Sequence, residues 1–266
     1  MVTRIVFLGT AGDSIVMGKQ LRASGGIYFE HESLKLLINP GPGTLVRAKQ
    51  FDIALREIDG VLVTHSSILS SNDVNATVDA ITNGGLDKKG VVVSTPAALD
   101  GSATISPLLS SSSVANLEKI VRLNIGDKVA LNDIEIMPTP TQHSDPSRIG
   151  FMLICPEVKI SYVGDSAYAK KLVRAHAQTD VLIVNLPNLT AKTDSMGVAE
   201  ATQLISEIQP GIAIITGFGI KVVEADILNI VRNIQQQTKV QTVAAKDGLS
   251  IDPQSYVKLT EQTKLQ

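Results

Sequence analysis

The chain has no tryptophan, and aromatic residues make up only 3% of its 266 residues. Proteins that bind single-stranded nucleic acid stack bases on aromatic side chains, so this scarcity argues against such a role. The net charge of −2 argues in the same direction, because nucleic acids and anionic membranes attract basic surfaces. No apolar run approaches the roughly 20 residues of a membrane-spanning helix. We therefore expect neither nucleic acid nor membrane as a partner.

Cysteine is also scarce, with Cys155 as the single example, so no disulfide can form within the chain. This fits a reducing compartment, and we expect the protein to be cytoplasmic. Cys155 stands in the apolar segment FMLICPEVKI, where no neighbour in the sequence would activate its thiol. We predict that it is a core residue and not a nucleophile.

Hydrophobic residues, by contrast, make up 44% of the chain, which is enough for a well-buried core. Residues 120–163 read as a succession of strands, and strands and helices alternate after them. This order predicts two sheets packed together, with helices covering their outer faces. The composition does not change along the chain, so we predict a single domain over residues 1–266.

Three polar residues mark the places where chemistry is expected. His65 follows a short apolar run in VLVTHSSILSSND, just before a helical pattern over residues 72–82. His143 lies in the polar loop MPTPTQHSDPS, and Asp165 ends the strand VKISYVGDS. Two histidines and an aspartate at strand ends and in a loop indicate the remains of a metal site. The other histidines look uninvolved, with His31 in a hairpin turn and His176 exposed on a helix.

The segment PGPG, residues 40–43, precedes a short predicted helix over residues 44–49. Free N–H groups at such a turn can bind phosphate. The segment lacks the GxxxxGK[ST] spacing of a phosphate-binding loop, however. We therefore favour a tight turn in which glycine supplies unusual backbone dihedrals.

Seven segments, in this order along nearly the whole chain, resemble the metallo-β-lactamase superfamily, and in particular its small archaeal-type hydrolases. They are RIVFLGT, INPGPGTLVR, VTH, TPTQHSDPSRIGFML, ISYVGDS, ITGFG and VAAKDGLSI. The resemblance implies an α/β (α+β) fold, a four-layer αββα sandwich. It places the site at one edge, between the two sheets.

The resemblance also implies a set of metal ligands, because members of this superfamily usually bind two metal ions, most often zinc, through seven residues. The corresponding positions here are His65, Ser67, Leu69, Ser70, His143, Asp165 and Gly217. By the family's pattern the first metal uses positions 65, 67, 143 and 165, and the second uses 69, 70, 217 and the shared 165. Four of these positions, Ser67, Leu69, Ser70 and Gly217, lack the family's ligand and are vestigial. Asn39 likewise stands where the family has a supporting carboxylate.

The first hypothesis for function is a catalytically inactive or impaired relative, a pseudoenzyme that binds a small molecule or a protein, or has a regulatory role. Hydrolysis in this fold needs a metal-bound hydroxide. Leu69 replaces a carboxylate that, in the family, orients that hydroxide. The sequence favours this first hypothesis, under which we expect no cofactor. It leaves open whether the protein is an enzyme. A homodimer is common for this fold.

Two hydrolase hypotheses stand beside it. One is a mononuclear enzyme that cleaves esters or phosphodiesters with a zinc, manganese or iron ion on His65, His143 and Asp165. The other needs no metal and uses a serine nucleophile with His65 or His143 as its base. The candidate nucleophiles are Ser66, Ser67 and Ser70.

Overall fold

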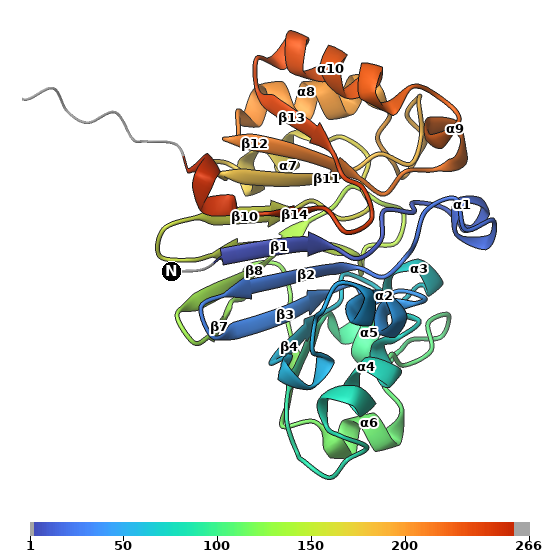
Figure 1. Cartoon of the computed structure of the whole chain (residues 1–266), viewed down its shortest axis with the longest axis vertical. Helices are drawn as coiled ribbons and strands as arrows, with labels where there is room; N and C mark the ends of the chain where they lie inside the picture. Colours follow the sequence, from blue (N-terminus) through green and yellow to red (C-terminus); the bar gives the residue numbers. More distant parts are fainter. Residues whose placement is uncertain (1–2, 258–266) are drawn as a thin grey trace, which may run out of the picture.

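Two seven-stranded β-sheets form the centre of the molecule (Figure 1), in a computed structural model that describes residues 3–257. The predicted domain also includes residues 1–2 and 258–266, which lie outside the described residues. The first sheet has the spatial order β14 (Ser250–Ile251), β1 (Thr3–Phe7), β2 (Ile27–His31), β3 (Leu34–Ile38), β4 (Gly60–Leu62), β5 (Val91–Ser94) and β6 (Lys119–Arg122). The second has the order β13 (Gln241–Ala244), β12 (Ile212–Thr216), β11 (Val181–Asn185), β10 (Lys159–Tyr162), β9 (Ile149–Ile154), β8 (Ile134–Pro140) and β7 (Val129–Leu131).

Both sheets combine an antiparallel part with a parallel part. Strands β14, β1, β2 and β3 pair antiparallel, and β3 to β6 pair parallel. Strands β7 to β10 pair antiparallel, and β10 to β13 pair parallel. Parallel neighbours need crossover connections, and these place helices on the outer faces of the sheets.

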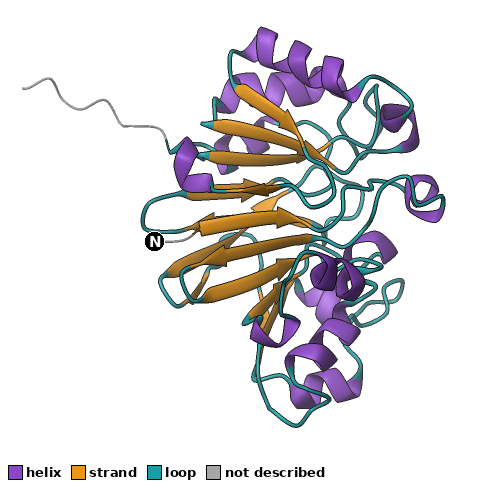
Figure 2. Cartoon of the chain, in the orientation of Figure 1, coloured by secondary structure: helices purple, strands orange, loops and turns teal. Residues whose placement is uncertain are grey.

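The helices cover those outer faces (Figure 2). The helices that follow strands of the first sheet are α2 (Thr44–Gln50), α4 (Val74–Ile81), α5 (Pro96–Asp100) and α6 (Ser111–Asn116). Those of the second sheet are α7 (Lys170–Ala175), α8 (Val198–Ile208) and α10 (Ile227–Thr238). Shorter helical pieces are α1 (Ser14–Gly18), α3 (Ile68–Ser71), α9 (Ile220–Val223), η1 (Leu55–Glu57) and η2 (Pro253–Tyr256).

Apolar side chains form three buried layers, one between the sheets and one under each group of helices. Along β1, Ile5 and Phe7 pack between the sheets, whereas Val6 packs beneath the helices of the first sheet. Successive residues of a strand point to opposite faces, so a strand buried on both faces is apolar throughout. The predicted αββα sandwich is therefore confirmed.

Two predictions about histidines were wrong. His31 is the last residue of β2 and is buried, with Nδ1 2.9 Å from Oγ1 of Thr3. His176 follows the end of α7 and is also completely buried. The sequence predicted a turn for His31 and an exposed helix position for His176, whereas β2 extends to His31 and α7 ends at Ala175. The predicted helix over residues 72–82 is present as α4, and the short helix α3 precedes it.

Candidate functional site at the edge between the sheets

The candidate site lies where strands of both sheets end, on one edge of the sandwich. His65 follows β4, Asp165 follows β10, Asn185 ends β11, and Gly217 follows β12. His143 comes from the loop over residues 141–148, between β8 and β9. The carboxyl ends of parallel strands are where open α/β sheets bind ligands. The structure therefore brings the three predicted ligands to the same edge of the sandwich.

His65 is buried and contacts Asp165. Its Nε2 lies 3.6 Å from Oδ2 of Asp165, and its Nδ1 lies 2.9 Å from Oγ1 of Thr64. Burial lowers the pKa of His65 to about 4, although the Asp165 carboxylate opposes the shift. The ring is therefore neutral near pH 7.

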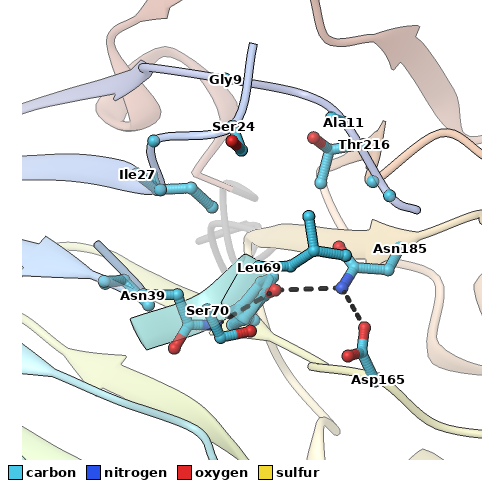
Figure 3. Close-up of a pocket in the computed structure, with 16 residues that line it drawn as sticks. Gly9, Ala11, Ser24, Ile27, Asn39, Leu69, Ser70, Asp165, Asn185 and Thr216 are labelled. Atoms are coloured by element: carbon cyan, nitrogen blue, oxygen red, sulfur yellow. Dashed lines mark hydrogen bonds between the residues drawn. The ribbon is translucent and has the colours of Figure 1, made fainter. Parts of the chain in front are cut away.

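Asp165 accepts a hydrogen bond at each carboxylate oxygen. Nη1 of Arg148 lies 3.1 Å from Oδ2, and Nδ2 of Asn185 donates to Oδ1 at 2.8 Å. Figure 3 shows Asn185 directed at Asp165. Nδ2 of Asn185 also lies 3.0 Å from the Tyr162 hydroxyl, which lies 3.5 Å from Nδ2 of Asn39. The aspartate is thus fixed by protein groups on both sides.

His143 carries its ring proton on Nε2 and not on Nδ1. Its Nδ1 accepts a hydrogen bond from the backbone N–H of Asp145 at 2.9 Å. Burial and the nearby Arg148 guanidinium lower the pKa of His143, which keeps the ring neutral near pH 7. A neutral imidazole whose Nδ1 accepts must carry its proton on Nε2. The ring is therefore set to donate to a ligand.

A cavity of about 320 Å³ opens beside these residues. His143, Arg148 and Asp165 line it together with Lys192 and Asp194. A separate, smaller cavity of about 70 Å³ is lined by Leu69, Ser70 and Gly217, among others (Figure 3). Five of the seven positions implied by the resemblance line these two adjacent cavities, which share Asp165, and His65 and Ser67 line neither.

The vestigial positions offer few ligand atoms. Leucine and glycine side chains have none, and a neutral serine hydroxyl is a poor zinc ligand. Ser70 Oγ lies 3.5 Å from Nε2 of His65, and Ser67 precedes the first residue of α3. With its pKa near 4, His65 is a weak base for activating a serine. Among residues 3–257, no three histidine, cysteine, aspartate or glutamate side chains are arranged to hold a metal ion. The residues present do not fit a two-metal centre.

The PGPG turn does not offer a phosphate cradle. Asp73 Oδ2 accepts hydrogen bonds from the backbone N–H groups of Gly43 and Thr44, both at 2.9 Å. Gly43 has a φ of 89°, which glycine adopts without strain. The interpretation as a tight turn is confirmed. Asp73 directly precedes α4, but its side chain makes no capping hydrogen bond to that helix and binds the turn instead.

Sequence reasoning missed two important residues, Arg148 and Asn185. Arg148 stands five positions after His143, in the same segment HSDPSR. Asn185 is the first polar residue after the apolar run VLIV. The available signals were the position of Arg148 inside a predicted ligand loop and the position of Asn185 at the end of a predicted strand. Cys155, in contrast, is buried as predicted, and burial raises the pKa of its thiol to about 12.

Comparison with known proteins agrees with this architecture. Residues 35–218 match the family model described as the beta-lactamase superfamily domain. The uncharacterised protein MJ1374 of Methanocaldococcus jannaschii is 27% identical over 256 residues, covering 95% of this chain and 96% of that protein. Ribonuclease Z of Methanopyrus kandleri is 26% identical over 171 residues, covering 62% of this chain and 54% of that protein.

A solved structure shows the same fold. The metallo-β-lactamase-fold protein YhfI of Bacillus subtilis superposes with a TM-score of 0.76 at 15% identity, covering 94% of this chain and 98% of that one. The chain belongs to the β-lactamase superfamily, in its metallo-β-lactamase fold, and the two relatives above are archaeal. None of the helices in the described part of the chain is long and apolar enough to cross a membrane.

Proposed function

We propose that this protein is a non-hydrolytic member of its hydrolase family, which binds a small polar molecule in its cleft without a metal ion. The hydrogen bonds that His143 and Asp165 already make within the protein support the proposal. Nδ1 of His143 accepts a hydrogen bond, and both oxygens of Asp165 do the same. Protein donors therefore hold both oxygens of Asp165, and the second ring nitrogen of His143, Nε2, carries a proton that a metal ion would have to displace. Hydrolysis in this fold depends on a metal-bound hydroxide, which these contacts disfavour.

The cleft suits a small molecule in size and chemistry. Its volume of about 320 Å³ lies at the lower end of the range for ligand pockets. Arg148 and Lys192 contribute positive charge to its lining, and Asp165 and Asp194 contribute negative charge. A lining of both signs favours a polar ligand that carries hydrogen-bond donors and acceptors. A protein partner is the less supported alternative.

The first test measures metal and hydrolysis together. Protein purified without a chelating tag is analysed by plasma mass spectrometry. It is then assayed against p-nitrophenyl acetate and bis(p-nitrophenyl) phosphate, with and without added zinc, manganese or iron(II). We expect far less than one equivalent of metal and no hydrolysis above that of His143→Ala. Metal-dependent hydrolysis that a chelator stops would contradict the proposal.

The second test looks for the ligand by thermal shift across a panel of small polar metabolites. A ligand that binds only the folded protein stabilises it by RT ln(1 + [L]/Kd), about 2.7 kcal/mol at 100 times Kd. We expect at least one such ligand, with its shift reduced by Lys192→Ala. The matched control is Lys221→Ala, which removes an exposed lysine that pairs with Glu224 on the surface.

A mononuclear hydrolase of esters or phosphodiesters is the second candidate, favoured by the approach of His65 Nε2 to 3.6 Å from Asp165 Oδ2. Two ligands of one metal ion can lie at such a separation. His143 would have to transfer its proton to Nδ1 to join them. Near one equivalent of metal, with activity lost in both His65→Ala and His143→Ala, would support this candidate over the first.

A further inference from the structure

We infer that Arg148 and Asn185 replace the two metal ions of the family, each holding one oxygen of Asp165. The inference rests on the proposal that the site works without metal, and goes beyond it by naming the groups responsible. In the family's pattern Asp165 is the ligand shared by both metals. Here Oδ2 is 3.1 Å from Nη1 of Arg148, and Oδ1 is 2.8 Å from Nδ2 of Asn185.

Arg148 lies on the side of the first metal. The oxygen that it contacts is the one 3.6 Å from Nε2 of His65, a residue of the first ligand set. Asp145 holds the guanidinium from another direction, with Oδ2 3.5 Å from Nε. The backbone of the loop is fixed too, because Thr141 Oγ1 donates to the Arg148 carbonyl at 2.8 Å. Two carboxylates therefore flank one guanidinium, whose side chain is only 20% exposed.

Asn185 lies on the side of the second metal, where position 217 would supply a ligand. Gly217 has a φ of +61°, and a Cβ atom added to it would come within 2.8 Å of Oδ1 of Asn185. Asn185 thus occupies space that a side chain at position 217 would need. The conformation of Asn185 and a ligand side chain at position 217 are therefore sterically incompatible.

The replacement has an electrostatic consequence. A guanidinium stays charged at every physiological pH, so Arg148 always offsets part of the negative charge that Asp165 and Asp145 share around it. A divalent cation that approached His65 and Asp165 would meet this fixed positive charge at close range, and the repulsion disfavours binding. Arg148 therefore both satisfies the carboxylate and excludes a metal, whereas Asn185 satisfies the second oxygen without charge.

The test removes the charge and asks whether metal enters. Full-length wild type, Arg148→Gln and Arg148→Lys are titrated with zinc chloride. Bound zinc is measured by equilibrium dialysis, and the melting temperature by differential scanning fluorimetry. We expect Arg148→Gln to melt lower than wild type without zinc, to bind one zinc per chain, and to regain stability as it does so. Arg148→Lys keeps the charge and should bind as little as wild type. Adding His143→Ala to Arg148→Gln should abolish the zinc effect.

The outcomes separate the two proposals. If wild type binds zinc as well as Arg148→Gln does, both the inference and the metal-free function are wrong. If Arg148→Gln is folded by circular dichroism but binds no zinc, the inference alone is wrong, and the missing ligands by themselves exclude the metal. If Arg148→Gln does not fold, Arg148→Met decides, because it also removes the charge but keeps a long side chain that can pack in the same space. Zinc should stabilise that variant more than wild type, and equal responses would overturn the inference.

Discussion

Asn39 fixes the residue before His65, because its Oδ1 accepts a hydrogen bond from the backbone N–H of Thr64 at 2.8 Å. Its Nδ2 also donates to Oγ1 of Thr64 at 2.9 Å, and that oxygen lies 2.9 Å from Nδ1 of His65. Asn39 is only 7% exposed and has a φ of 52°, a conformation that asparagine tolerates better than most residues. The amide thus holds the His65 loop in place of the carboxylate that the family resemblance implies at this position.

We predict that Asn39→Asp destabilises the protein by about 1–3 kcal/mol, although it restores the residue implied by the family. An aspartate cannot donate to Thr64 Oγ1, and it would bury a carboxylate next to a polar group left without its donor. Urea unfolding at pH 7.5 measures the change. Asn132→Asp is the matched control, with a φ of 53° but an exposed position in the turn between β7 and β8. The control should change stability by no more than about 0.5 kcal/mol. Equal losses in both variants would show that the Asn39 amide has no special role.

We predict that acid destabilises the protein through His176. Its ring is buried, neither ring nitrogen has a hydrogen-bond partner among residues 3–257, and burial lowers its pKa from 6.5 to about 4. In the unfolded chain the His176 ring is protonated as the pH falls through about 6.5, whereas in the folded chain it stays neutral until about pH 4. The stabilisation is complete above pH 6.5 and is lost as the pH falls, by about 3 kcal/mol at pH 4.

Urea unfolding at several pH values between 7.5 and 4.5 tests this prediction. The leucine substitution His176→Leu should reduce the slope of stability against pH over that range. His65, whose pKa is also lowered to about 4, should retain part of the slope in this variant. A variant that loses stability with falling pH as steeply as wild type would contradict the role of His176.

We predict that Cys155 does not react in the native protein. The thiol is 4% exposed, and burial, aided by Asp133 and Glu157, raises its pKa to about 12. Because the thiolate is the reactive form, iodoacetamide at pH 8 should modify no native protein and one cysteine per chain in urea. Mass spectrometry reads the result. Native labelling at the rate of a free thiol would show that this part of the core opens readily.

The sequence was sufficient to predict the sandwich, and the three residues that it singled out lie at one edge of it. Alternating and fully apolar strands predicted two covered sheets, and His65, Asp165 and His143 were recognised from strand ends and a loop. It was insufficient for contacts that depend on the path of a loop. Arg148 reaches Asp165 across 17 positions, and Asp73 reaches Gly43 across 30. The burial of His176 could not be read from its type, because the end of α7 decides where that ring points.

The most direct test of the account is a crystal structure after soaking in zinc chloride, with anomalous scattering recorded at the zinc edge. We predict no anomalous peak near Asp165, with Arg148 Nη1 and Asn185 Nδ2 still bound to its two oxygens. A strong peak between His65, His143 and Asp165, with Arg148 displaced, would contradict the account and establish a mononuclear metal site.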